Sequence, residues 1–189
     1  MTDLEPDGSV SARPISKLAL HSPLPAGAAR RFGDLMRLSE LLNEQSISLS
    51  LVARDKESCI KELVSLLESA HGVNTKGEIL SKVLQRESMM STGIGNGVAI
   101  PHGKTRLLDH LVAACGVSPS GLDFDTMDGE PASLFILLVS PESLRGPHVK
   151  ALANVSRLLK EETVRNSLRQ APSPGEFLAV LREAENRYL

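Results

Sequence analysis

From Leu38 onward, apolar and polar residues follow regular periods that predict interspersed strands and helices. Residues 47–52 alternate apolar and polar side chains, which is typical of a half-buried strand. Asp55 can then cap a helix, and Gly72 can end it. The apolar residues that recur at helical spacing between them are Ile60, Leu63, Val64, Leu67 and Ala70. The pattern therefore predicts a strand followed by an amphipathic helix.

The middle of the chain predicts a second helix and two central strands. Thr75 and Glu78 have the spacing of a capping box, which indicates where this helix begins. Residues 111–117 and 133–139 are continuous apolar runs bounded by turn residues, as in strands that are covered on both faces. Between the two runs, residues 121–124 are typical of a short edge strand that ends in a turn.

The last part of the chain predicts helices. One begins near Pro147, and its inward-facing residues are Leu152, Val155 and Leu159. A short helical turn follows around residues 164–168. Ser173 and Glu176 form another capping box at the start of a last helix, whose inner residues are Phe177, Leu178 and Leu181. Because strands and helices are interspersed, we expect an α/β fold in which helices flank a mixed sheet, formed as a single domain by residues 38–189.

Residues 1–37 differ from the rest of the chain. They contain four of the eleven prolines, together with Ser, Gly and Ala, and their apolar residues follow no sustained period. Such a composition favours a flexible extension that is dispensable for folding. The alternative is an N-terminal arm that packs on the domain or on a second subunit.

The overall composition excludes several classes of function. Hydrophobic residues make up 41% of the chain, which is enough for a core, and 21 basic against 23 acidic residues give a net charge of −2. This balance argues against nucleic-acid binding, which normally requires a basic excess, and the scarcity of aromatic residues argues against a base-stacking surface. Two cysteines, Cys59 and Cys115, cannot form a disulfide framework.

No apolar signal region opens the sequence, and no apolar run approaches the about 18–20 residues that a membrane span requires. We therefore expect a cytoplasmic protein without stable membrane insertion.

Glycines gather in one segment of the chain, at Gly93, Gly95, Gly97 and Gly103. Glycine permits the backbone conformations in which several amides converge on an anion such as phosphate. Two phosphate-binding motifs nearly match this segment, but both need a glycine where Val98 stands. The five histidines form no metal-binding pattern with carboxylates, and a serine nucleophile motif is also absent. We expect no metal and no cofactor.

His102 follows the glycine segment directly. Pro101 stiffens the approach to it, and Gly103 removes bulk behind it. An imidazole with its ordinary pKa of about 6.5 offers a neutral, nucleophilic nitrogen at cytosolic pH. A segment suited to hold an anion therefore adjoins a side chain that can carry one.

The segment from Arg86 to Lys104 contains Ser-Thr-Gly-Ile-Gly-Asn-Gly followed by Val-Ala-Ile-Pro-His-Gly-Lys. It resembles the active-site segment of the enzyme IIA proteins of the bacterial phosphoenolpyruvate phosphotransferase system. The resemblance is to the fructose/mannitol class, and within it most to the nitrogen-related regulatory enzyme IIA. It extends over roughly residues 38–185, and it implies a mixed sheet flanked by helices.

The resemblance also implies roles for three residues. His102 matches the phosphorylated histidine, His148 matches a second histidine that lines the same site, and Arg86 matches an arginine near the phosphoryl group. A guanidinium suits that last role because it can pair with phosphoryl oxygens through planar, charge-assisted bonds. Two departures from the family pattern are the Met89-Met90 pair, where Met-Gly is usual, and Gly146-Pro147 before His148.

Structural interpretations of these residues stay open. Arg86 is also explained as a solvated residue at a helix end, and His148 as a residue that merely stands near a helix N-terminus. The candidates for a phosphate-binding loop are Ser91, Thr92, Gly93, Gly95 and Gly97. The two hydroxyls among them are equally explained by hydrogen bonds within the loop.

The leading hypothesis is a phosphoryl carrier, a component of a phosphotransferase rather than an enzyme that turns over a small molecule. It accepts phosphate on His102 from an HPr-type phosphocarrier protein and acts as a regulator on a downstream target through its phosphorylation state. The absence of a transporter or DNA-binding domain in the sequence favours the regulatory type. One alternative is a sugar-specific enzyme IIA that passes phosphate to a transporter domain, and another is a non-phosphorylated binding module of the same fold.

Overall fold

The computed structural model describes residues 36–189. After two short 3-10 helices, η1 (Leu38–Glu40) and η2 (Glu44–Ser46), the chain runs through a short strand and two helices, which are β1 (Ile47–Ser48), α1 (Lys56–His71) and α2 (Glu78–Met89). Five strands follow: β2 (Gly93–Gly95), β3 (Val98–Ala99), β4 (His102–Thr105), β5 (Val112–Leu122) and β6 (Ala132–Pro141). Three helices complete the domain: α3 (Arg145–Leu158), α4 (Glu162–Arg169) and α5 (Pro174–Tyr188).

The six strands form one mixed sheet in the order β1-β5-β6-β3-β2, and β4 also pairs with β6. The central pair β5–β6 is antiparallel, whereas β1 runs parallel to β5, and both β3 and β4 run parallel to β6. β3 and β4 therefore follow each other along the same edge of β6, where Val98 pairs with Leu134 and His102 with Leu138. The predicted α/β fold with a mixed sheet is confirmed.

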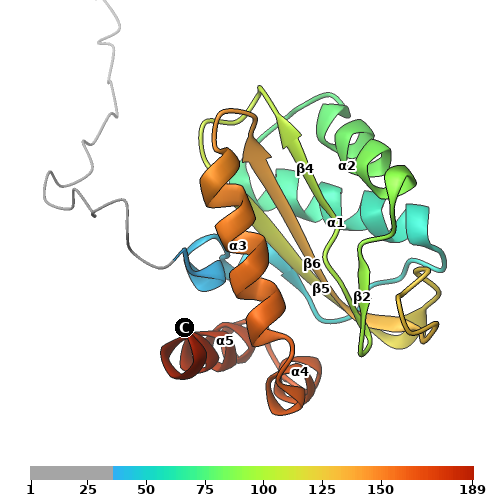
Figure 1. Cartoon of the computed structure of the whole chain (residues 1–189), viewed down its shortest axis with the longest axis vertical. Coiled ribbons are helices and arrows are strands. Elements are labelled where there is room, and N and C mark those ends of the chain that lie inside the picture. Colours follow the sequence, from blue (N-terminus) through green and yellow to red (C-terminus); the bar gives the residue numbers. More distant parts are fainter. Residues whose placement is uncertain (1–35) are drawn as a thin grey trace, which may run out of the picture. The chain divides into compact units, whose positions relative to one another are not determined.

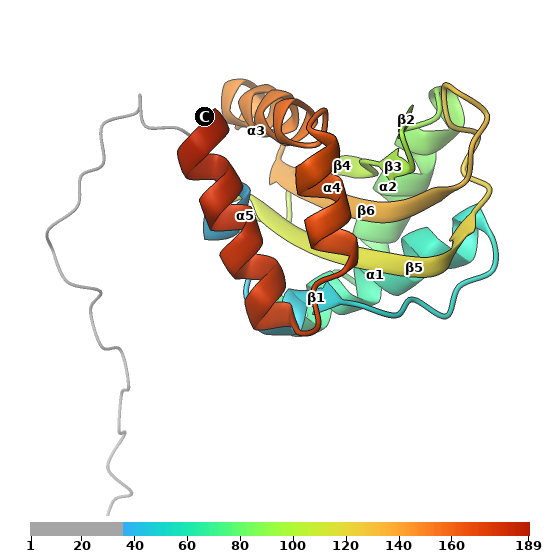
Figure 2. The same cartoon turned by 90° about the horizontal axis from the view of Figure 1, so that it is seen from below.

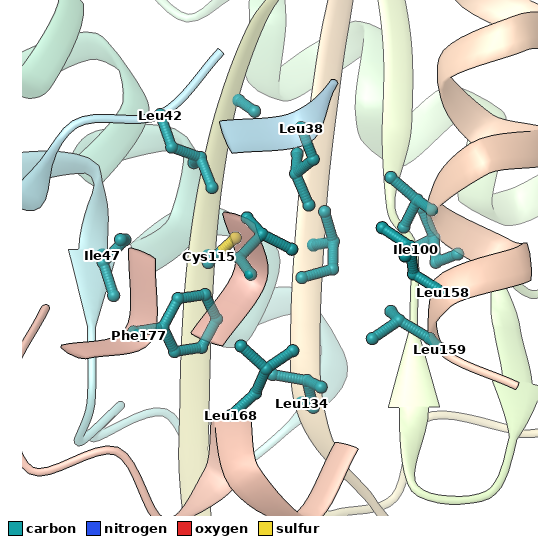
Figure 3. Close-up of a cluster of buried hydrophobic side chains, with 14 of the residues drawn as sticks. Leu38, Leu42, Ile47, Ile100, Cys115, Leu134, Leu158, Leu159, Leu168 and Phe177 are labelled. Atoms are coloured by element: carbon teal, nitrogen blue, oxygen red, sulfur yellow. The ribbon is translucent and has the colours of Figure 1, made fainter. Parts of the chain in front are cut away.

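The sheet is buried on both faces, as the continuous apolar runs predict. Alternate residues of β5 and β6 belong to two separate hydrophobic clusters. One cluster contains Cys115, Leu134, Ile136 and Leu138 and is covered by α3, α4 and α5. The other contains Ala114, Phe135, Leu137 and Val139 and is covered by α1 and α2. Figure 2 shows the two groups of helices on opposite sides of the sheet, and Figure 3 shows Phe177 and Leu168 against strand residues of the first cluster.

The helix caps explain where the long helices begin. The Asp55 side chain accepts a hydrogen bond from Ser58 N at the start of α1, and Gly72 ends this helix in the left-handed conformation with φ 64°. The Ser173 side chain accepts from Glu176 N at the start of α5, with Pro174 at the first helical position. Both predicted starts are confirmed.

Two predicted elements differ at their boundaries. The strand predicted over residues 47–52 has only two residues. Leu51 N still donates to Val117 O of β5, whereas the amides of Val52 and Ala53 bond the Glu62 carboxylate of α1. Residues 121–124 form no separate strand. β5 itself continues to Leu122 after an irregularity in its register with β6.

The predicted capping box of the second helix is wrong. α2 begins after Gly77, which has φ 84° and provides no side-chain cap. The Thr75 hydroxyl donates to Glu68 of α1, and Glu78 accepts a hydrogen bond from Thr105 on β4. Thr75 and Glu78 therefore bond tertiary partners instead of each other, although Thr75 Oγ1 also accepts from Ile79 N at 3.4 Å.

Two residues of the predicted extension 1–37 fall within the described part of the chain, and residues 1–35 lie outside it. Arg37 donates to Asn186 Oδ1 at 2.7 Å, and Met36 O accepts from Asn154 Nδ2 at 2.9 Å. The last two residues of that extension thus contact α5 and α3. Within residues 36–189, no helix combines the length and the apolar character needed to cross a membrane.

Candidate functional site

β4 lies between α2 and α3 (Figure 1). Residues from the C-terminal half of α2, the start of β4 and the first turns of α3 line one pocket. Gly103 makes the approach of α2 to β4 possible, because a Cβ at this position would lie 3.0 Å from Val83 Cγ2. Arg86 follows Val83 by almost one helical turn, and His102 directly precedes Gly103. The close contact between the two elements therefore places the guanidinium beside the imidazole.

The two ring nitrogens of His102 have different partners. Nδ1 lies 2.8 Å from the carbonyl oxygen of Ile100, which can only accept, so Nδ1 carries the proton. Nε2 consequently has a free lone pair, and it accepts a hydrogen bond from Arg86 Nε at 3.1 Å. Arg86 is itself held by a 2.8 Å bond from Nη1 to Met90 O. The backbone thus selects the tautomer in which Nε2 is unprotonated.

His148 lies in the first turn of α3 and is almost fully buried. Its Nδ1 is 2.8 Å from the hydroxyl of Ser140 on β6. The rings of His148 and His102 lie 5.6 Å apart between centroids and are tilted by 55°. Arg86, His102 and His148, which the sequence analysis assigns to one site, are therefore brought together.

Both histidines are poised to be neutral near pH 7. Burial lowers the pKa of His102, and the charges of Arg86 and Lys104 act in the same direction against the Ile100 hydrogen bond. Burial, followed by the charges of Lys104 and His102, lowers the pKa of His148 to about 4. The site therefore offers two uncharged imidazoles beside fixed positive charges.

The pocket at this junction has a volume of about 420 Å³. Besides the two imidazoles, its walls include the side chains of Lys82, Arg86 and Lys104. Lys82 stands one helical turn before Arg86 on α2, so both cations project from the same helix face. Three cationic side chains around a neutral nucleophile suit a phosphoryl group, which carries about two negative charges near pH 7.

The five residues predicted to form a phosphate-binding loop lie in and before a hairpin, away from the pocket. Residues 93–99 form the β2–β3 hairpin, and Ser91, Thr92, Gly93, Gly95 and Gly97 do not line the pocket. Ser91 donates to Phe124 O, and a Cβ at Gly93 would lie 2.8 Å from Thr126 Cγ2. The structure therefore does not bring these five residues together around His102.

Glu87 does not line the pocket but bonds the segment that leads to His102. The sequence analysis did not identify this residue. It is buried, accepts from Thr92 N at 3.1 Å and Thr92 Oγ1 at 2.6 Å, and pairs with Lys56 Nζ at 3.0 Å. Thr92 O in turn accepts from Ile100 N at 3.0 Å, and Ile100 O is the partner of His102. Glu87 thus holds Thr92, Thr92 holds Ile100, and the Ile100 carbonyl sets the tautomer of His102.

Lys82, Lys104 and Ser140 also contribute to the site without belonging to its predicted set. The four-residue spacing of Lys82 and Arg86 is a sequence signal that indicates a shared helix face. Lys104 is part of the Ile-Pro-His-Gly-Lys segment. Ser140 has no such signal, because only the packing of α3 on β6 brings it to His148.

Comparison with known proteins identifies the family. Residues 40–184 match the family described as "Phosphoenolpyruvate-dependent sugar phosphotransferase system, EIIA 2". The chain is 32% identical over 146 residues to a nitrogen regulatory protein of Bradyrhizobium diazoefficiens, covering 77% of this chain and 95% of that protein. It is 35% identical over 148 residues to the fructose-specific EIIABC component of Bacillus subtilis, covering 78% of this chain but only 23% of that longer protein.

A solved structure agrees with these sequence matches. The crystal structure of the nitrogen regulatory protein IIA-Ntr from Neisseria meningitidis superposes with a TM-score of 0.71 at 30% identity. The match covers 76% of this chain and 98% of that one. The chain therefore belongs to the EIIA 2 family of the phosphoenolpyruvate-dependent sugar phosphotransferase system.

Proposed function

We propose that the chain is a histidine phosphoryl carrier that accepts a phosphoryl group on Nε2 of His102 from an HPr-type phosphohistidine protein. The observation that carries this proposal is the asymmetric bonding of the His102 ring. Nδ1 donates to Ile100 O, so Nε2 presents its lone pair beside Arg86. This nitrogen can attack phosphorus without first losing a proton.

The transfer balances without a cofactor. The lone pair of Nε2 forms the new P–N bond while the P–N bond of the donor breaks, and its electron pair returns to the donor imidazole. Arg86 exchanges its bond to Nε2 for bonds to the phosphoryl oxygens. Such catalysis consists mainly of positioning and charge stabilisation, which Lys82, Lys104 and His148 supplement. Since donor and acceptor are both phosphoimidazoles, the exchange is nearly thermoneutral and reversible.

The rim of the pocket supports a protein as the donor. Met89 and Val149 line the pocket and are 72% and 62% exposed, and the adjacent Met90 is 71% exposed. Large apolar side chains exposed beside a charged centre are typical of protein-docking surfaces. We place this docking in the cytoplasm.

For the downstream role, we favour regulation through the phosphorylation state. The match covers 95% of the nitrogen regulatory relative, so this chain resembles nearly all of a protein that is named as a regulator. The second candidate is delivery of phosphate to a sugar transporter domain, which the similar identity to a fructose-specific component favours. Presenting the phosphorylated chain to a fructose-type EIIB domain separates the two, because transfer supports sugar delivery and retention of phosphate supports regulation.

The carrier role is tested with phosphoenolpyruvate, enzyme I and an HPr-type protein, followed by intact mass. We expect one phosphoryl group that is lost in acid and kept in alkali, as for a P–N bond. His102→Ala abolishes this gain, whereas the control His110→Ala, which changes an exposed histidine outside the pocket, retains it. Full labelling of His102→Ala would refute the assignment.

A further inference from the structure

The hydroxyl of Ser140 lies within hydrogen-bond distance of His148, on the strand against which the helix of His148 packs. Ser140 stands near the end of β6, is fully buried, and places its Oγ 2.8 Å from His148 Nδ1. In the β4–β6 register, Ser140 pairs with Lys104 and Leu138 pairs with His102. Leu138 and Ser140 lie on the same face of the strand, because side chains alternate along it. This face is the one that α3 covers, so the hydroxyl points at the helix that carries His148.

The direction of the Ser140–His148 hydrogen bond follows from the available partners. Among residues 36–189, Ser140 Oγ has no hydrogen-bond partner other than His148 Nδ1. A buried hydroxyl proton without an acceptor is costly, so the hydroxyl donates to Nδ1. The ring is neutral at pH 7, because burial and Lys104 lower the pKa of His148 to about 4. A neutral ring that accepts at Nδ1 has its proton on Nε2.

We propose that Ser140 is a positioning residue that holds His148 in the Nε2–H tautomer, so that this N–H can donate to a phosphoryl group on His102. Nδ1 of His148 lies against buried Ser140, while His148 also lines the pocket, with its ring centroid 5.6 Å from that of His102. The opposite tautomer would present a lone pair to the phosphoryl oxygens, which also carry lone pairs. The inference rests on the proposed function of His102, but its tautomer claim applies to the unphosphorylated chain as well.

The first test is long-range ¹H–¹⁵N NMR of the imidazoles in the unphosphorylated full chain near pH 7. We expect wild-type His148 to be the Nε2–H tautomer, and Ser140→Ala to populate the Nδ1–H form. Ser118→Ala is the matched control, because Ser118 is a buried serine on the neighbouring strand β5 whose Oγ has no hydrogen-bond partner among the described residues. A wild-type His148 in the Nδ1–H form would overturn the proposal, and this result does not depend on whether any variant folds.

The second test is a double-mutant cycle of phosphoryl acceptance by His102. Loss of one neutral hydrogen bond predicts that Ser140→Ala slows acceptance about two- to tenfold. In a His148→Gln background the same change should have no further effect, because a glutamine amide donates without a choice of tautomer. Equal slowing in both backgrounds would assign Ser140 a purely structural role and overturn the inference. If wild type accepts no phosphate, the proposed carrier function fails, and the NMR result still decides the tautomer.

Discussion

The β2–β3 hairpin and the His102 pocket lie next to each other in the chain, but they use their residues in opposite ways. In the hairpin, glycines leave space for neighbours: a Cβ at Gly95 would lie 2.9 Å from Asp128 Oδ2, and one at Gly97 would overlap Arg169 Nη2. In the pocket, the chemistry resides in side chains. Imidazoles and cations from α2, β4 and α3 surround one cavity.

A glycine-rich segment beside a candidate anion site therefore need not line that site. The amide of Asn96 bonds Asp128 Oδ2 at 2.7 Å, and the carbonyls of Asn96 and Gly97 accept from Arg169. These backbone groups are used for packing within the domain. The hairpin instead positions Ile100, whose carbonyl fixes the tautomer of His102.

Arg86→Ala should give the largest effect among substitutions that leave the nucleophile in place. A hydrogen bond to a charged group is worth about 1.5–3 kcal/mol, so acceptance by His102 should slow about ten- to a hundredfold. Arg86→Lys should recover only part of the rate, because an ammonium lacks the planar fork. A quenched-flow time course of carrier-dependent phosphorylation measures all three proteins.

Arg187→Ala provides the matched control for Arg86, since Arg187 is also the basic residue in the last turn of its helix. It should accept phosphate at the wild-type rate. If Arg86→Ala behaved like this control, Arg86 would be a solvated helix-end residue. The side chains of the pocket would then not explain phosphoryl acceptance as proposed.

The depressed pKa of His148 predicts a pH-dependent stability that originates in the pocket. The folded value of about 4 lies below the ordinary 6.5, so the unfolded chain binds the proton more readily. Stability from this residue is complete above pH 6.5 and is lost as pH falls towards 4. At about 1.4 kcal/mol for each pH unit between the two values, the full loss well below pH 4 is about 3–4 kcal/mol, of which about 2–3 kcal/mol is already lost at about pH 4.5.

Urea unfolding of wild type and His148→Gln between pH 7 and 4.5 isolates this contribution, because both proteins share the same carboxylates. The free energy of unfolding should fall less steeply with decreasing pH in His148→Gln. Parallel curves for the two proteins would mean that His148 is protonated as easily in the fold as in the unfolded chain.

Local patterns predicted much of the fold and one part of the site. Continuous apolar runs located β5 and β6, and Asp55 and Ser173 marked the starts of α1 and α5, because these signals depend on neighbours in the sequence. The grouping of Arg86, His102 and His148 came from the resemblance to a family, since residues separated by up to 62 positions share no local period.

Other features were not predictable because distant partners decide them. Glu68 accepts from the Thr75 hydroxyl and Thr105 donates to Glu78, so the predicted capping box does not form, and Glu62 accepts from the amides of Val52 and Ala53 in the segment that was predicted as strand. The positions of Glu87 and Ser140 behind the two histidines likewise arise from helix packing on the sheet.

The smallest effect on phosphoryl acceptance is expected for a substitution in the β2–β3 hairpin. Gly97 has φ 71°, and an alanine there would also displace Arg169 from the carbonyls of Asn96 and Gly97. Gly129 has a similar φ of 74°, but a Cβ there would meet nothing within 4 Å. Left-handed strain costs about 1–2 kcal/mol in both alanine variants, and the lost hydrogen bonds should destabilise Gly97→Ala by about 1 kcal/mol more.

The rate of phosphoryl acceptance separates packing from phosphate binding at this glycine. If Gly97 only permits packing, Gly97→Ala lowers the unfolding midpoint in urea below that of Gly129→Ala and leaves acceptance at His102 within about twofold of wild type, since a change of less than 0.5 kcal/mol is below a factor of about 2.5. If its amide holds the phosphoryl group, displacing the hairpin slows acceptance about tenfold or more in protein that is still folded. That second result would mean that the hairpin binds the phosphoryl group together with the pocket, and that its role is not limited to packing.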